Sequence, residues 1–111
     1  MKLKLYSNAH NSGGERVRIA LALKEVPHEY LTIKTIGWEA YRKINPQSLL
    51  PTLSVDEVLI TQSTAILEFL EEKYPAPPLL PADPILRAQA RALGQVVACE
   101  MDAIDVGRVR R

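Results

Sequence analysis

Cysteine is nearly absent from this chain, which has a single one, Cys99, among 111 residues. One cysteine excludes an internal disulfide and a CxxC redox pair. The net charge of only +1 gives no electrostatic reason to expect nucleic acid or an anionic membrane as a partner. No apolar run is long enough to span a membrane, and the first residues lack the features of a signal peptide. We therefore expect a cytoplasmic protein that binds neither nucleic acid nor membrane.

Metal-ligand patterns are also missing, because His10 and His28 show no ligand spacing with other histidines, cysteines or carboxylates. No metal site is therefore predicted.

The chain has the composition of an ordinary globular protein, with hydrophobic residues making up 47%. Its length leaves room for one domain with a modest core, together with a fragment of a second.

Apolar periodicity gives the order of the predicted elements. A strand at 2–6 is followed by a polar, glycine-containing loop at 7–14 and a helix at 15–26, which Pro27 ends. The later elements are a strand at 28–33, a short helix at 38–44, a hairpin of 52–55 and 58–60, and a helix at 62–74. The order β-α-β-α-β-β-α predicts an α/β sandwich around a mixed sheet.

The predicted helix at 62–74 has two faces of different polarity. Its apolar residues are expected to face the sheet, and its glutamates are expected to face outward. The inward set is Ile66, Phe69 and Leu70, and the outward set is Glu68, Glu71 and Glu72.

The C-terminal third begins with a proline-rich segment at 75–81, which should form a stiff, extended linker. Asp83 and Pro84 have the residue types of a helix N-cap and a first helical position. An apolar stripe then runs toward the end of the chain with no helix stop signal. We infer that the chain is the front of a larger two-domain protein, or that a partner covers the stripe. A frayed tail that needs no cover is the remaining alternative.

Two short motifs indicate a site for a small extended peptide with a free carboxylate. Pro51 begins a β run and has no N–H to donate, so it belongs at an edge or bend. If the Leu50–Pro51 bond is cis, the bend leaves the backbone N–H and C=O of Leu50 free for a ligand. Gln62 and Ser63 begin the next helix, where unpaired N–H groups and the helix dipole favour an anion. The simpler interpretation is a trans proline and ordinary helix capping.

The segments that contain these motifs, 45–53 (NPQSLLPTL) and 62–72 (QSTAILEFLEE), resemble the glutathione transferase N-terminal domain. Residues 16–21 (RVRIAL) and 74–84 (YPAPPLLPADP) resemble the zeta class in particular, which includes maleylacetoacetate and maleylpyruvate isomerases. The resemblance covers nearly the whole chain in the same order.

This resemblance implies a thioredoxin-like fold with a mixed four-stranded sheet. It implies a glutathione-binding domain at 1–75, a proline-rich linker at 76–83, and at 84–111 the first helix of an incomplete all-α domain. It also implies a cis Leu50–Pro51 bond. Leu50 and Pro51 would then pair with the glutathione backbone, and Gln62 and Ser63 would bind the γ-glutamyl carboxylate.

The loop before the first predicted helix is the candidate for thiol activation. A hydroxyl or amide there can donate to a thiolate and, with the helix N-terminus, lower the pKa of a thiol. Zeta-class proteins carry Ser-Ser-Cys at this place, which aligns with Asn11, Ser12 and Gly13 here. The activating serine is thus replaced by Asn11, whose amide can still donate, and Ser12 is a second donor. Capping of the helix by these residues is the alternative.

The last predicted helix differs from the zeta-class pattern on the substrate side. Where the family commonly has His, Gln or Asn, this chain has Asp102, Asp105 and Val106. Two carboxylates would repel an acidic substrate, whereas Arg108 matches a frequent family arginine and would offset them. We therefore expect a substrate pocket that is altered or completed elsewhere, with Asp102 and Arg108 on its substrate side.

Two functional hypotheses follow. The first is a glutathione-dependent transferase or cis–trans isomerase, a homodimer by resemblance, in which the activated thiol adds to the double bond of a small electrophile such as maleylacetoacetate or maleylpyruvate. The second is a glutathione-binding or dimerisation module without turnover, motivated by the replacements at Asn11, Gly13, Asp102 and Asp105. A thiol–disulfide oxidoreductase is excluded, because the site has no cysteine.

Overall fold

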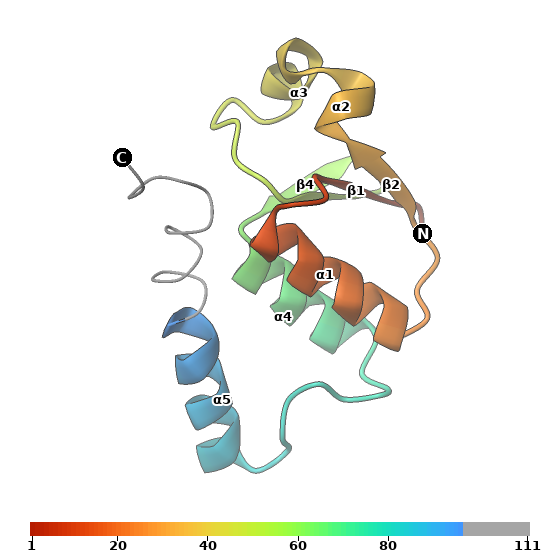
Figure 1. The fold of residues 1–111 in the computed structure, drawn as a ribbon. Helices are drawn as coiled ribbons and strands as arrows, with labels where there is room; N and C mark the ends of the chain where they lie inside the picture. Colours follow the sequence, from red (N-terminus) through yellow and green to blue (C-terminus); the bar gives the residue numbers. More distant parts are fainter. Residues whose placement is uncertain (97–111) are drawn as a thin grey trace.

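The structure, a computed structural model, describes residues 1–96 of the chain as four strands and five helices (Figure 1). The order of the main elements agrees with the order predicted from the sequence. The elements are β1 (Leu3–Ser7), α1 (Ser12–Leu23), β2 (Glu29–Thr32), α2 (Ile33–Ile36), α3 (Trp38–Ile44), β3 (Thr52–Val55), β4 (Val58–Thr61), α4 (Ser63–Lys73) and α5 (Pro84–Val96).

The four strands form one mixed sheet in the order β2-β1-β3-β4. Strand β1 pairs in parallel with β2, while the β1–β3 and β3–β4 pairs are antiparallel. Successive side chains of a strand point to opposite faces, so Leu5 belongs to one core cluster and Tyr6 to the other. The expected thioredoxin-like arrangement is confirmed.

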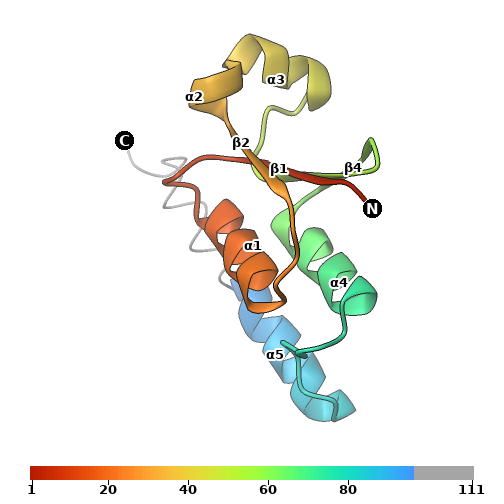
Figure 2. The same ribbon diagram turned by 90° about the vertical axis from the view of Figure 1, so that its right-hand side faces the viewer.

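Helices cover both faces of this sheet. Figures 1 and 2 show α1 and α4 side by side on one face, and α2 and α3 on the other. The main core lies under α1 and α4, and a smaller cluster around Tyr41 lies under α2 and α3. The main core consists of Leu3, Leu5, Val17, Ala20, Leu21, Val26, Leu53, Ile66 and Leu70.

Helix α1 begins earlier than the sequence pattern suggests, at Ser12 instead of residue 15. Asn11 caps it, because its Oδ1 accepts a hydrogen bond of 2.6 Å from the Gly14 backbone N–H. Gly14 is therefore not a loop glycine. A Cβ atom there would lie 1.7 Å from the Ser7 Oγ atom, so glycine permits α1 to approach β1 closely.

The helix α2 is absent from the sequence prediction, which continued the second strand to residue 33. Thr32 ends the strand, because its Oγ1 accepts from the Thr35 N–H at 3.2 Å and caps the new helix. Gly37 follows with a φ of 86° and separates α2 from α3. The predicted hairpin is confirmed with a two-residue turn at Asp56 and Glu57, both at positive φ, as type I′ turns require.

The outward position expected for Glu71 is wrong. Glu71 is buried beside α1, with its Oε1 atom 2.9 Å from the Nζ atom of Lys24. Lys24 Nζ also donates to the carbonyl oxygens of Tyr74 (2.5 Å) and Pro77 (2.8 Å). The Glu71 carboxylate in turn accepts from the N–H groups of Leu79 and Leu80. This pair fastens the proline-rich segment to α1 and α4.

The start predicted for the last helix is confirmed. Helix α5 begins at Pro84, and the Leu86 N–H donates to the Asp83 carboxylate at 3.0 Å. The division of the chain at 75/76 and 83/84 into domain, linker and second domain stays a prediction.

Candidate functional site

The first part of the site is the N-terminus of α1. Asn11 uses its side-chain oxygen to cap this helix, as the simpler interpretation has it. Because Oδ1 accepts the bond from Gly14, the Asn11 amide nitrogen is left to donate elsewhere. Ser12, the first residue of α1, is half-buried beside it.

The second part is the Leu50–Pro51 segment that leads into β3. The Leu50–Pro51 peptide bond is cis, as the resemblance implies, and Pro51 is buried. Among residues 1–96, no hydrogen bond is recorded for the backbone N–H or C=O of Leu50. These two groups have the properties needed to pair with an extended backbone.

The third part is the N-terminus of α4. Gln62 precedes this helix at a φ of 72°, and its side chain makes no capping hydrogen bond. The first helical bond joins the Ile66 N–H to the Gln62 carbonyl at 3.0 Å, which leaves the N–H groups of Ser63, Thr64 and Ala65 without an intrahelical acceptor. The Gln62 side chain therefore does not serve as a helix cap, and the N-terminus of α4 can still accept an anion.

These three parts meet at Gly13. A Cβ atom on Gly13 would lie 3.2 Å from Pro51 Cδ and 3.5 Å from both Ser63 Cβ and Asn11 Oδ1. Residues from α1, the segment before β3 and α4 are thus neighbours, although they are far apart in the sequence. Glycine at this point keeps side-chain atoms out of the space between them.

A buried hydrogen-bond network, which the sequence did not reveal, supports the Leu50–Pro51 segment. The Tyr41 hydroxyl donates to the Leu49 carbonyl at 2.5 Å and lies 2.6 Å from Thr52 Oγ1. Asn45 Nδ2 donates to the same carbonyl at 3.1 Å and to Thr52 Oγ1 at 3.2 Å. The network therefore holds the chain on both sides of Leu50 and Pro51. The only sign of this network in the sequence is that Tyr41 and Asn45 are four residues apart, as on one face of a helix, and that Pro46 follows.

Tyr41→Phe is expected to lower the free energy of unfolding by about 1 kcal/mol, because Leu49 and Thr52 lose a buried partner. Tyr30→Phe is the matched control, since the buried Tyr30 hydroxyl has no hydrogen-bond partner within the described residues. Removing that hydroxyl should leave stability unchanged or raise it slightly. Urea unfolding of both variants checks the prediction, and equal losses would contradict it.

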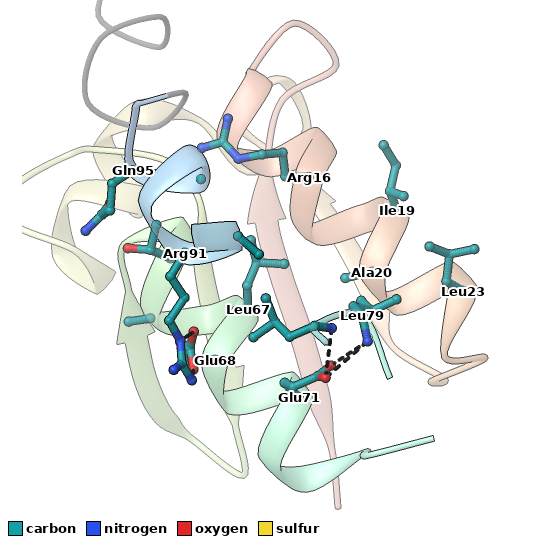
Figure 3. A pocket seen from close by; sticks show the side chains of 15 residues that line it. Arg16, Ile19, Ala20, Leu23, Leu67, Glu68, Glu71, Leu79, Arg91 and Gln95 are labelled. Carbon is teal, nitrogen blue, oxygen red and sulfur yellow. Dashed lines mark hydrogen bonds and ion pairs between the residues drawn. The ribbon is translucent and has the colours of Figure 1, made fainter. Parts of the chain in front are cut away.

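A groove of about 650 Å³ lies between α1, α4 and α5 (Figure 3) and reaches the N-terminus of α4, because Arg16, Thr64 and Ala65 are among the residues that line it. Its walls are mainly apolar, and Arg91 of α5 forms a two-pronged ion pair with Glu68 of α4 at one side, both N–O distances being 2.9 Å. The hydrogen bond from Arg91 lowers the pKa of Glu68 below its usual value. Arg16 lies at one end of the groove, and Ile19 and Leu23 line its α1 wall.

Several candidates from the sequence cannot be placed. Asp102 and Arg108, expected on the substrate side, lie outside the described residues, as do Cys99, Asp105 and Val106.

Within residues 1–96, no three His, Cys, Asp or Glu residues form a group that could hold a metal ion. None of the helices in this part of the chain is long and apolar enough to cross a membrane.

Comparisons with known proteins agree with the fold and the motifs. Residues 12–78 match the family described as the glutathione S-transferase N-terminal domain. The probable maleylacetoacetate isomerase of Caenorhabditis elegans is 53% identical over an alignment of 97 residues, with 85% of this chain and 45% of that protein covered.

Two solved structures are also similar. A holo maleylpyruvate isomerase, a bacterial zeta-class glutathione S-transferase, has a TM-score of 0.79 and 45% identity over 87% of this chain and 48% of its own. The maleylacetoacetate isomerase of Anaeromyxobacter dehalogenans, with glutathione in its active site, has a TM-score of 0.75 and 40% identity over 88% of this chain and 49% of its own. The chain thus spans about half the length of these relatives.

The family match covers more than half of the chain, and the relatives supply the class. The chain belongs to the glutathione S-transferase family and is similar to its zeta-class maleylacetoacetate and maleylpyruvate isomerases.

Proposed function

We propose that this chain carries the glutathione site of a glutathione-dependent transferase or cis–trans isomerase that acts on a small electrophile of the maleylacetoacetate or maleylpyruvate type. The observation that supports it most is the meeting of Asn11, Pro51 and Ser63 around Gly13. We extend the proposal to a homodimer, and to Asp102 and Arg108 on the substrate side.

The free groups on these residues fit glutathione, an extended peptide with a carboxylate at each end. The N–H and C=O of Leu50 would pair with its backbone as in strand addition, beside the buried ring of Pro51. The unpaired N–H groups that begin α4, together with Gln62 and Ser63, would hold the γ-glutamyl carboxylate at the positive end of the helix dipole.

The thiol end would then lie at the N-terminus of α1. When bound, glutathione supplies a thiolate that adds to an electrophilic double bond and then leaves, which permits rotation, or remains as a conjugate. Asn11 would stabilise the thiolate through its amide nitrogen while its oxygen holds the helix cap. Gly13 would let the ligand approach the backbone closely.

Two measurements on one sample of the full chain test this proposal. Retention on immobilised glutathione reports the peptide site, and a maleylpyruvate isomerase assay reports turnover. We expect retention and turnover together. Retention without turnover would support the second candidate, a glutathione-binding or dimerisation module, which the replacements at Asn11 and Gly13 favour. Absence of retention would contradict both.

The thiol donor can be identified by replacing Asn11 with aspartate. Asn11→Asp keeps an oxygen for the helix cap but removes the amide donor and adds a negative charge. If Asn11 activates the thiol, turnover at neutral pH should fall about tenfold, which equals a rise of about one unit in the thiol pKa. Ser12→Ala should keep turnover. Loss with Ser12→Ala alone would assign activation to Ser12.

A further inference from the structure

A hydrogen bond between two distant parts of the chain lies next to the proposed carboxylate site. Arg16, in the second turn of α1, donates from Nη2 to the Ser63 Oγ atom at 2.9 Å. The two residues are 47 positions apart, and Ser63 is only 8% exposed. Arg16 thus reaches from α1 to the N-terminus of α4.

The direction of this bond determines what the Ser63 hydroxyl can do next. A guanidinium group has five N–H donors and no acceptor, so Ser63 Oγ must accept from Arg16. The Ser63 hydroxyl hydrogen is therefore available only for a different acceptor. Among residues 1–96, the structure records no acceptor for it. The Ser63 hydroxyl, which accepts from Arg16, can therefore donate its hydrogen to an anion.

We infer that Arg16 is a positioning residue that fixes the Ser63 hydroxyl as a donor toward a ligand carboxylate at the start of α4. This inference rests on the proposed glutathione site and adds a residue that the motif Gln62–Ser63 does not contain. Arg16 polarises the hydroxyl and adds positive charge to the helix end, and both effects favour a carboxylate over a neutral group.

Arg18 supplies a matched control on the same helix. Its guanidinium lies 4.5 Å from the centre of the Tyr30 ring and pairs with Glu15 at 2.8 Å, so its partners differ from Ser63, the partner of Arg16. Arg16→Gln and Arg18→Gln remove the same charge two residues apart. A difference between them is therefore not an effect of the net charge of the chain, and repeating Arg16→Gln in a Ser63→Ala background shows whether it arises from the contact with Ser63.

The experiment is calorimetric titration of the full chain with two ligands, glutathione and an analogue that lacks the γ-glutamyl α-carboxylate. Arg16→Gln should weaken glutathione about tenfold, roughly 1.4 kcal/mol, and leave the affinity for the analogue unchanged. Arg18→Gln should affect neither. Arg16→Lys should restore part of the loss. In a Ser63→Ala background, Arg16→Gln should have less than about a threefold effect, because the two residues act through one contact.

The outcomes separate the inference from the proposed function. If the unaltered chain binds the analogue as tightly as glutathione, or binds neither, the proposed site fails. If the chain prefers glutathione and Arg16→Gln keeps that preference in full, the site stands and the role of Arg16 is wrong. Equal weakening of both ligands by Arg16→Gln would indicate a general structural role and would also overturn the inference.

Discussion

Lys24→Met is expected to lower the free energy of unfolding by about 3–5 kcal/mol, because it leaves the Glu71 carboxylate buried without its cation. The Lys24 side chain is fully buried and that of Glu71 is 6% exposed. Lys24 also supplies hydrogen bonds to the carbonyl groups of Tyr74 and Pro77, so these too lose a donor. Urea unfolding at neutral pH measures the effect.

Lys73→Met is the matched control, since Lys73 is exposed in the last turn of α4. A change within about 0.5 kcal/mol is expected for such a surface position. The double variant Lys24→Met, Glu71→Leu should recover much of the loss, because no unpaired charge remains buried. Equal effects of Lys24→Met and Lys73→Met would contradict the importance of the pair.

The same pair gives stability a dependence on pH. Burial by itself raises the pKa of Glu71, but the bonds from Lys24 and from the Leu79 and Leu80 N–H groups lower it below its usual value. The unfolded chain therefore binds the proton first as the pH falls. The contribution of Glu71 is present above the ordinary glutamate pKa and is lost as the pH falls through the lower folded value. Glu71→Gln should weaken this part of the acid dependence.

Gly14→Ala should lower the free energy of unfolding by about 3 kcal/mol, the upper end for added volume in a packed site. Its Cβ atom would lie 1.7 Å from Ser7 Oγ and 2.8 Å from Ser7 Cβ, and Ser7 is fully buried. Rotation of the Ser7 hydroxyl cannot relieve the contact between the added Cβ atom and Ser7 Cβ. Helix α1 would have to move away from β1, and the N-terminus that carries Asn11 would move with it.

Gly94 offers the comparison, because it is also a helical glycine but a Cβ atom there meets nothing within 4 Å. Gly94→Ala should raise stability by about 0.5–1 kcal/mol, since alanine loses less conformational freedom in a helix. Adding Ser7→Gly to Gly14→Ala should restore part of the loss. Thermal unfolding distinguishes the cases, and similar behaviour of the two alanine variants would contradict the close packing.

Local signals in the sequence were enough to predict most of the helices and strands. Asp83–Pro84 has the residue types of a helix start, and α5 begins there. Residues 52–55, which alternate between polar and apolar, and the apolar residues 58–60 predicted the hairpin, and β3 pairs with β4 there. The element missed was α2, whose cap at Thr32 and end at Gly37 are local signals that the continuing strand pattern concealed.

Contacts between distant residues could not be predicted in the same way. Lys24 shares a helix face with buried Val17 and Leu21, which indicates that it needs a partner, but nothing local identifies Glu71. The bond between Arg16 and Ser63 and the Tyr41 network depend likewise on how the helices pack on the sheet. The motif residues of the site were identified from their residue types and from the resemblance, whereas the contacts that support them were found only in the folded chain.

The central claim is that glutathione binds through the Leu50 backbone and the N-terminus of α4. Titration of the isotope-labelled full chain with glutathione, followed by backbone amide resonances, tests it most directly. Saturable shifts should be largest at the amides of Leu50, Ser63 and Thr64. They should be absent from Ile19 and Leu23, which line the α1 wall of the groove between α1, α4 and α5. No saturable shift, or shifts confined to Ile19, Leu23 and the rest of that α1 wall, would contradict this mode of binding.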